Sequence, residues 1–291
     1  MKLSVITICY NEKHIERTCE SIINQTNQDF EWVVIDGGST DKTLDILNKY
    51  KKRINVFVSE PDKGVYNAMN KGINLAKGEY LNFMNGGDEF ADNDVIAQFY
   101  NHIKYLGDSD VIYGNNLDIL EEKSQKITYP AQLDKMFFLQ KNLNHQSCFI
   151  KRNLFSAYGL YNENYSIISD WEKFLIFKIH NCTFSYMDDV TVAKFYKGGI
   201  SSSDKLQKEL ETMRLKYFTD EEIISLKFTD YTVRLFNLVP ILRIKNKPDL
   251  SATRILLFNF IPLYIIRRNR KSHKHFLFGF IPLLKLKGSR L

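Results

Sequence analysis

The sequence predicts an α/β protein with a mostly parallel sheet and helices on both of its faces. Short apolar runs alternate with segments of helical periodicity through the first third of the chain. Two of these runs lead into acidic residues in glycine-rich loops, at Asp36 and at Asp88. Because open α/β sheets bind ligands beyond the carboxyl ends of their strands, we expect both acids to line one binding site.

Apolar spacing assigns the elements of this alternating region in order. Continuous apolar runs predict buried strands at residues 3–9, 30–35, 55–59 and 80–84. Apolar residues three and four apart predict helices at residues 12–23, 43–50, 65–76 and 92–106. Strands separated by helices form βαβ units, which make parallel pairs.

After residue 110 the predicted elements become shorter. We expect strands at residues 111–113, 126–129, 148–150, 184–187 and 190–195. Helices are predicted at residues 133–139, 171–179 and 205–216. A third acidic position, Asp170, stands just before the second of these helices.

Composition is that of an ordinary globular protein. Of the 291 residues, 44% are hydrophobic and 25% are charged, which suits one large α/β domain with an appendage. The four cysteines lie far apart without Cys-x-x-Cys spacing, so we expect free thiols in a reducing cytoplasm. No signal peptide is recognised before the first strand.

Charge is distributed unevenly along the chain. Residues 231–291 hold 13 Lys/Arg and one acid, a net charge of +12, whereas the other residues hold 27 bases and 33 acids, a net charge of −6. A strongly basic tail on a mildly acidic body predicts that the tail faces an anionic surface.

The basic tail also contains an internal repeat. Residues 236–243, 258–264 and 278–285 resemble one another at offsets of 22 and 20 residues, and each contains one proline. The longest uncharged stretch has 12 residues, whereas a spanning helix needs roughly 20. We expect residues 201–291 to form a basic, α-helical extension that lies on a membrane surface. The alternative is a helical cap whose apolar faces pack on the body.

Three motifs in the first third carry a family resemblance. They are Cys-Tyr-Asn-Glu at 9–12, Val-Ile-Asp-Gly-Gly-Ser-Thr-Asp at 34–41, and Asp-Lys-Gly-Val-Tyr-Asn-Ala-Met-Asn-Lys-Gly at 62–72. Together they resemble family 2 glycosyltransferases, most of all the subgroup that builds bacterial O-antigen, capsule and colanic-acid repeat units. The resemblance implies a GT-A-type (Rossmann-like) fold, an inverting mechanism, a UDP-sugar donor and Mg2+ or Mn2+. It also implies a catalytic domain at residues 1–200, with a nucleotide-sugar-binding half to residue 110 and an acceptor-binding half after it.

The same resemblance assigns the donor site. Asp36 is expected to contact the uracil or ribose, which fits a carboxylate that follows a strand; the alternative is an Asp that caps the next helix. Residues 62–64 precede a helix whose amino end suits phosphate; the alternative is a turn before an exposed polar face. The complete expected donor set is Cys9, Tyr10, Asn11, Glu12, Asp36, Asp62, Lys63, Gly64, Asn67, Asn85, Gly86 and Gly87.

Asp88 is the expected metal ligand. The family's Asp-x-Asp-type signature is replaced here by Asn-Gly-Gly-Asp at 85–88, which leaves Asp88 as its carboxylate. Mg2+ takes oxygen ligands and commonly completes its shell with water and substrate phosphates, so one carboxylate can suffice. The alternative is a turn with a capping Asp.

Asp170 is the expected general base, because Ser-Asp-Trp-Glu at 169–172 resembles the family's short acidic motif. The alternative is a helix N-cap. Trp171 is expected to offer an apolar face to the acceptor sugar, unless it fills core, and His145 and Gln146 are expected acceptor contacts, although a lone His is more often structural.

The predicted function is transfer of a hexose or N-acetylhexosamine from a UDP-sugar to a lipid-diphosphate-linked saccharide. The predicted location is the cytoplasmic, inner face of the bacterial plasma membrane, with peripheral attachment through the tail. The product class is surface polysaccharide, such as lipopolysaccharide O-antigen or capsule. Two alternatives remain open, a non-catalytic nucleotide-binding scaffold and a nucleic-acid-binding protein that uses the basic tail.

Overall fold

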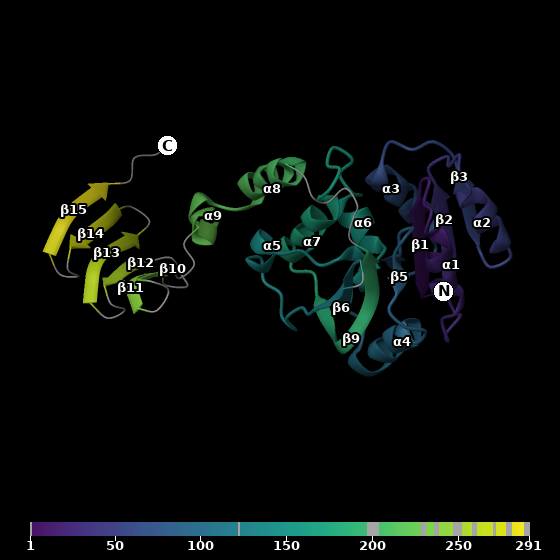
Figure 1. Ribbon diagram of the computed structural model, residues 1–291, viewed down its shortest axis with the longest axis horizontal. Helices are drawn as coiled ribbons and strands as arrows, with labels where there is room; N and C mark the ends of the chain where they lie inside the picture. The colour runs from purple at the N-terminus through teal and green to yellow at the C-terminus, as the bar shows by residue number, and fades with distance from the viewer. Residues whose placement is uncertain are drawn as a thin grey trace. The chain divides into compact units, whose positions relative to one another are not determined.

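The structure is a computed structural model (Figure 1). It describes residues 2–121, 123–196, 204–227, 231–235, 239–246, 252–257, 261–269, 272–277 and 281–287. The chain divides into two compact units, Met1–Glu211 and Thr212–Leu291.

The first unit is built on a mixed sheet whose first part is parallel. Strands β1 (Leu3–Cys9), β2 (Glu31–Asp36), β3 (Val56–Ser59) and β4 (Tyr80–Phe83) pair in parallel in the order β3-β2-β1-β4. Each was predicted from its apolar run. The register pairs Cys9 with Asp36, so the loops that follow β1 and β2 begin side by side.

The sheet continues beyond β4 with mostly antiparallel pairs, in the order β4-β8-β6-β9-β5 with β7 beside β6. The strands are β5 (Glu89–Phe90), β6 (Val111–Leu120), β7 (Lys123–Ile127), β8 (Cys148–Lys151) and β9 (Phe184–Tyr196). Strand β9, which pairs in parallel with β6, is one continuous strand, whereas the sequence predicted two strands at residues 184–187 and 190–195. Its register against β6 shifts near Asp189, which has a φ of 55°, so a bulge interrupts the apolar pattern without ending the strand.

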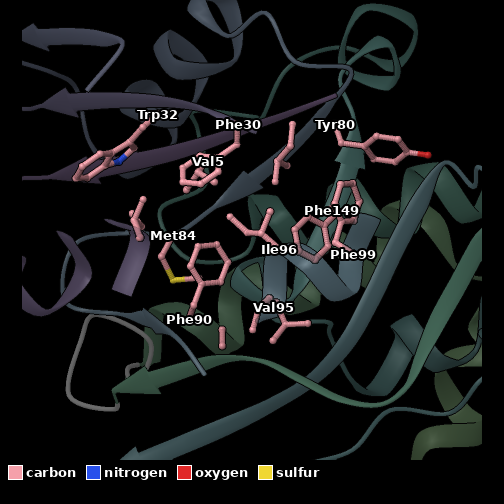
Figure 2. Packing of buried hydrophobic residues seen from close by; sticks show 14 of the residues in the cluster. Val5, Phe30, Trp32, Tyr80, Met84, Phe90, Val95, Ile96, Phe99 and Phe149 are labelled. Atoms are coloured by element: carbon pink, nitrogen blue, oxygen red, sulfur yellow. The ribbon is translucent and has the colours of Figure 1, made fainter. Parts of the chain in front are cut away.

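Helices cover both faces of the parallel part, as predicted. They are α1 (Ile15–Ile23), α2 (Thr43–Lys49), α3 (Val65–Leu75) and α4 (Val95–Leu106). On one face, Val5 and Trp32 belong to a core that includes Ile96 and Phe99 of α4 (Figure 2). On the other face α3 packs on β1 and β2. A Cβ added at Gly72 of α3 would lie 2.5 Å from Cγ2 of Ile6, so glycine permits this close approach.

Shorter elements carry the second half of the first unit. They are α5 (Phe137–Gln140), the 3₁₀ turn η1 (His145–Ser147), α6 (Asn153–Tyr158), α7 (Ser169–Ile179), α8 (Asp204–Tyr217, which extends into the second unit) and, wholly within the second unit, α9 (Asp220–Lys227). The sequence predicted α5, α7 and α8. It did not predict α6, which is too short to show a period.

The structure corrects the expectation that the whole extension is α-helical. Beyond α9, the described segments are β10 (Tyr231–Leu235), β11 (Val239–Asn246), β12 (Ala252–Leu257), β13 (Ile261–Asn269), β14 (Ser272–Leu277) and β15 (Ile281–Lys287). They form a sequential antiparallel sheet. The described part of each repeat therefore lies in a strand, β11, β13 or β15, so the repeat recurs once every two strands.

Proline explains this outcome. Pro240, Pro262 and Pro282 each take the second position of a strand, next to a register shift in the pairing with the preceding strand. Proline breaks a helix interior because it lacks an N–H group and clashes with the preceding turn, whereas an irregular strand position tolerates it. Within the described residues, no helix has the length and apolar character needed to cross a bilayer.

Candidate active site

The loops after β1 and β2 are joined into one rim. The backbone N–H of Asn11 donates to Oγ of Ser39 at 2.8 Å, and Oδ1 of Asn11 accepts from the N–H of Thr40 at 2.8 Å. Asn11 has a φ of 48°, a left-handed conformation that asparagine tolerates. Tyr10 is 62% exposed beside it, so its ring is available to a ligand.

Asp36 is fully buried and saturated with hydrogen bonds. Oδ2 accepts from the N–H groups of Gly38 and Ser39 and from the hydroxyl of Ser59, at 3.1, 2.9 and 2.7 Å. Oδ1 accepts from the Ser39 hydroxyl at 2.5 Å and from Sγ of Cys9 at 3.7 Å. Asp36 thus orders the glycine loop, and contact with a nucleotide would require exchange of one of these partners. Burial, then the charge of Asp36, raises the pKa of the Cys9 thiol, so Cys9 stays a neutral donor.

The Asp62 loop lies against this rim. A Cβ added at Gly37 would meet Oδ2 of Asp62 at 2.5 Å, so a side chain there would displace the carboxylate. Oδ1 of Asp62 accepts from the N–H of Gly64 at 2.8 Å. Lys63 is exposed, and its backbone N–H donates to Oδ1 of Asn67 at 3.2 Å. The structure therefore places the Asp62 side chain against the loop that follows Asp36, and the part of Asp62 and Lys63 in donor binding stays a prediction.

Helix α3 ties this donor side to the second half of the unit. Asn67 and Asn70 donate to the two carboxylate oxygens of Glu163 at 3.0 and 2.9 Å. Asn70 also accepts from the N–H of Tyr161 at 2.9 Å. Asn67, predicted to contact the donor, thus uses its amide to hold the segment before α7. Sequence reasoning missed Glu163, which no local pattern distinguishes from a surface acid.

The loop after β4 lies on α1. A Cβ at Gly86 would lie 3.1 Å from Cγ of Glu12, and Gly87 has a φ of 94°. The hydroxyl of Thr18 accepts from the N–H of Gly87 at 2.9 Å, and Nε of Arg17 donates to its carbonyl at 2.6 Å. Gly87 is required for its positive φ, and Gly86 is required because Glu12 leaves little space for a side chain. Arg17 and Thr18 were not predicted, because they lie within a helix whose only sequence signal is amphipathicity.

Asp88 is buried and joins three segments. Oδ2 accepts from Nε2 of Gln146 at 2.7 Å, and Oδ1 accepts from the N–H of Tyr196 at 3.1 Å. Burial raises the pKa of Asp88 to about 6, against the opposing effect of these two donors. Gln146, predicted to contact the acceptor, instead has its side chain engaged by Asp88.

The residues present do not form a protein-held metal site. In the part of the chain that the structure describes, no three His, Cys, Asp or Glu side chains lie close enough together to hold an ion. Asp88 has both oxygens engaged, and the nearby Oδ1 of Asn85 is a buried acceptor without a partner. One enclosed carboxylate and one amide oxygen do not by themselves complete the shell of Mg2+ or Mn2+, so water and donor phosphates would have to supply the other ligands.

Asp170 is the centre of a hydrogen-bond network. Its Oδ1 lies 3.0 Å from the hydroxyl of Tyr66, and its Oδ2 lies 3.0 Å from Nδ1 of His145 and 3.3 Å from Nδ2 of Asn142. Nε2 of His145 in turn lies 2.9 Å from Nδ2 of Asn85. When Nδ1–H donates to Asp170, Nε2 is the acceptor of the Asn85 amide. His145 therefore connects the predicted base with the loop after β4.

Trp171 is anchored away from Asp170. Its indole N–H donates to the carbonyl of Phe138 at 2.7 Å, and the ring is half-buried. The indole thus fixes α7 against α5, and its part in acceptor binding stays a prediction.

Segments far apart in the sequence converge here. Asp88 and Asp170 are linked through the consecutive residues Gln146 and His145. Asp36 is linked to the loop after β4 through Cys9. The Cys9 thiol contacts Asp36, and a Cβ added at Gly86 would lie 3.0 Å from the Cβ of Cys9. The three acids are thus connected along one end of the sheet.

Comparison with known proteins defines the class of fold and then the family. The chain is similar to the crystal structure of TarS 1-349 from S. aureus in complex with UDP-GlcNAc, with a TM-score of 0.60 and 19% identity over 78% of this chain and 72% of that one. The fold is the GT-A glycosyltransferase fold. The family model described as glycosyl transferase family 2 matches residues 4–159, more than half of the chain. The chain belongs to this family.

Two curated relatives are also similar. One is the PGL/p-HBAD biosynthesis glycosyltransferase of Mycobacterium bovis, 35% identical over 173 residues, which are 58% of this chain and 66% of that protein. The other is the poly(ribitol-phosphate) beta-glucosyltransferase of Bacillus spizizenii, 36% identical over 121 residues, which are 39% of this chain and 19% of that protein. The match thus spans just under two thirds of the first relative and a fifth of the second.

Proposed function

We propose that this protein is an inverting glycosyltransferase that moves a hexose or N-acetylhexosamine from a UDP-sugar to a lipid-diphosphate-linked saccharide during synthesis of a bacterial surface polysaccharide such as O-antigen or capsule. The observation that carries the proposal is the Asp170 carboxylate, nearly buried and held by side chains from three segments at the end of a family 2 sheet. The UDP-GlcNAc complex of TarS and the names of the relatives support the donor and product classes.

In the proposed reaction the acceptor hydroxyl attacks the anomeric carbon on the face opposite the diphosphate. Asp170 takes the hydroxyl proton as the new C–O bond forms. The bond from the anomeric carbon to the diphosphate breaks, and UDP leaves with its electron pair. His145 and Asn142 hold the carboxylate in place, and preorganised donors of this kind cost no rearrangement during the reaction.

The donor is proposed to lie across the loops after β1, β2 and β4. Exposed Tyr10 and Lys63 supply an aromatic face and a positive charge, and the glycines of the loops allow backbone to approach phosphate. Asp36 contributes by holding its loop in shape. The acceptor is proposed to approach from the side of Asp170 and Trp171.

A divalent cation remains a family expectation for this protein. Mg2+ or Mn2+ would offset negative charge on the departing diphosphate. Because the described side chains do not build a metal site, we assign no step to the ion. Turnover with and without EDTA tests the requirement directly.

Non-catalytic nucleotide binding is the second candidate. It is favoured by the Asn-Gly-Gly-Asp sequence at 85–88 and by the internal hydrogen bonds of Asp88. Such a scaffold would bind UDP-sugars without hydrolysing or transferring them, so the same turnover assays separate the two candidates.

The second unit is proposed to associate peripherally with the inner face of the plasma membrane. Cross-strand pairing places Arg267 opposite Lys274, and Lys274 opposite Lys285. Residues 231–291 carry a net charge of +12, which an anionic surface attracts, and anionic lipid lies next to a lipid-linked acceptor.

Two experiments test the enzymatic proposal. A thermal-shift panel of nucleotide sugars, with and without Mn2+, identifies the donor, because a bound ligand raises the unfolding temperature. With that donor, we expect Asp170→Asn to lower transfer by about 10²–10⁴-fold, the usual contribution of a positioned base, and to preserve UDP binding.

Asp94→Asn is the matched control, because Asp94 is an exposed aspartate at the start of another helix. It should retain full transfer. Equal turnover of Asp170→Asn and the native chain would remove Asp170 from the mechanism.

A further inference from the structure

The two oxygens of Asp170 have different surroundings. Oδ2 accepts from two N–H donors, those of His145 and Asn142. Oδ1 contacts the hydroxyl of Tyr66 at 3.0 Å. A carboxylate oxygen has two lone pairs, so Oδ1 keeps one for the hydroxyl of an acceptor. The proton removed from the acceptor is therefore expected to arrive at Oδ1.

The Tyr66 hydroxyl lies within reach of two acceptors. Besides Asp170 it contacts the backbone carbonyl of Ile167 at 2.7 Å. Tyr66 is only 5% exposed. Burial and then the charge of Asp170 raise the pKa of Tyr66 well above its usual value, so the phenol stays protonated. One hydrogen can serve only one of the two acceptors at a time.

We propose that Tyr66 is a positioning residue whose single hydrogen moves from Asp170 to the Ile167 carbonyl when Asp170 takes the proton of the acceptor. While Asp170 is ionised, Tyr66 donates to Oδ1. After proton transfer, Oδ1–H donates to the Tyr66 oxygen, and the Tyr66 hydrogen rotates to Ile167. The proposal rests on the proposed function, in which Asp170 is the base.

This arrangement satisfies both protonation states without movement of heavy atoms. Tyr66 is the second residue of α3 and Asp170 the second residue of α7, so rigid helices fix the distance. A buried polar group without a partner is costly, and a bond to a charged group is stronger than a neutral one. The Tyr66 hydroxyl therefore has an acceptor both before and after the proton transfer, and so does the protonated Asp170 carboxyl.

Other ionisable groups also surround Asp170. They are His145, Tyr129, Cys148 and Tyr161. Burial raises the pKa of Tyr129, Cys148 and Tyr161, so these three stay neutral through the acidic and neutral range. His145 contacts the other oxygen of Asp170, so the test must separate its effect from that of Tyr66.

The carbonyl of Ile167 provides a readout that needs no substrate. In the native chain, a pH titration followed by ¹³C NMR should move the Ile167 carbonyl resonance together with the Asp170 side-chain carboxyl, assigned by its loss in Asp170→Asn. A purely structural Tyr66 would leave the Ile167 resonance constant through this transition. An Ile167 carbonyl resonance that stays constant while Asp170 titrates would overturn the proposal.

Tyr66→Phe should uncouple the two resonances. Phenylalanine has no hydroxyl hydrogen to pass to the Ile167 carbonyl, so the Ile167 resonance should no longer follow that of Asp170. Tyr161→Phe is the matched control. Its ring lies 5.6 Å from that of Tyr66, and its hydroxyl is buried without a partner, so it should leave both titrations unchanged.

Activity provides the second readout. With the donor from the thermal-shift panel, Tyr66→Phe should lower kcat about tenfold and leave the affinity for UDP unchanged. His145→Gln should alter kcat but keep the Ile167 response, which separates the two partners. A coupled Ile167 titration in a chain that turns over no nucleotide sugar would support the hydrogen switch and reject the transferase.

Discussion

At the scale of single residues, the three candidate aspartates have different surroundings. Asp36 accepts from five donors around one loop, and Asp88 is enclosed with two donors. Asp170 keeps a free lone pair on Oδ1 beside a switchable phenol. The first two therefore suit the maintenance of loop structure, and the third suits proton transfer.

The raised pKa of Asp88 predicts a pH dependence of stability. Its pKa is about 6 in the fold and 3.8 as the reference value, so between these values the folded state binds more protons than the unfolded state. Stability from this group is complete below about pH 4 and is lost as the pH rises through 6. The loss is at most about 3 kcal/mol.

Urea unfolding of the native chain and Asp88→Asn from pH 4 to 7 checks this prediction. The native chain should lose stability relative to the variant as the pH rises, because the amide does not ionise and Gln146 can turn its own amide to match. A constant difference between the two chains would contradict the assignment.

At the scale of elements, α3 connects the two halves of the first unit. Tyr66, Asn67 and Asn70 bond to the segment that leads into α7, while Gly72 brings the helix onto the sheet. The sequence predicted α3 from its apolar period, and the Asp-Lys-Gly-Val-Tyr-Asn motif marked its start. The partners of these side chains lie about 100 residues away, so no local pattern could identify them.

Gly72→Ala should destabilise the protein by about 1–3 kcal/mol, the usual cost of overpacking. Helix propensity alone predicts the opposite sign, because alanine favours a helix over glycine by about 1 kcal/mol. Packing should dominate, since the new Cβ would lie 2.5 Å from Ile6.

Asn74→Ala is the matched control for Gly72→Ala in denaturant unfolding, because Asn74 is exposed on the same helix. It should change stability by no more than about 0.5 kcal/mol. A stabilised Gly72→Ala would show that α3 shifts away from β1 at little cost.

At the scale of the whole molecule, charge separates the two parts of the chain. Residues 231–291 have a net charge of +12, while the rest of the chain has a net charge of −6. A basic tail is attracted to an anionic surface, and it is attracted to the acidic body as well. Binding to vesicles therefore separates the membrane proposal from the alternative of a tail that only packs on the body.

Vesicle binding tests this interpretation. Replacing Arg267, Lys274 and Lys285 by Ala should weaken binding to phosphatidylglycerol vesicles by about 100-fold, at roughly 1 kcal/mol for each base. Replacing the exposed Lys42, Lys51 and Lys52 removes the same charge from the body and should have little effect. Added salt should reduce binding of the native chain. Tighter binding to duplex DNA than to these vesicles would favour the nucleic-acid alternative.

The sequence by itself determined the βαβ order, the family motifs and the positions of the three acids, because apolar periodicity and glycine-rich loops are local properties. Only the tertiary structure decided the surroundings of each acid. It placed Gln146 on Asp88 and Tyr66 on Asp170, and it placed the prolines of the repeats in antiparallel strands. These outcomes depend on which distant groups meet, since burial and hydrogen-bond partners, rather than residue type, set the protonation and freedom of a carboxylate.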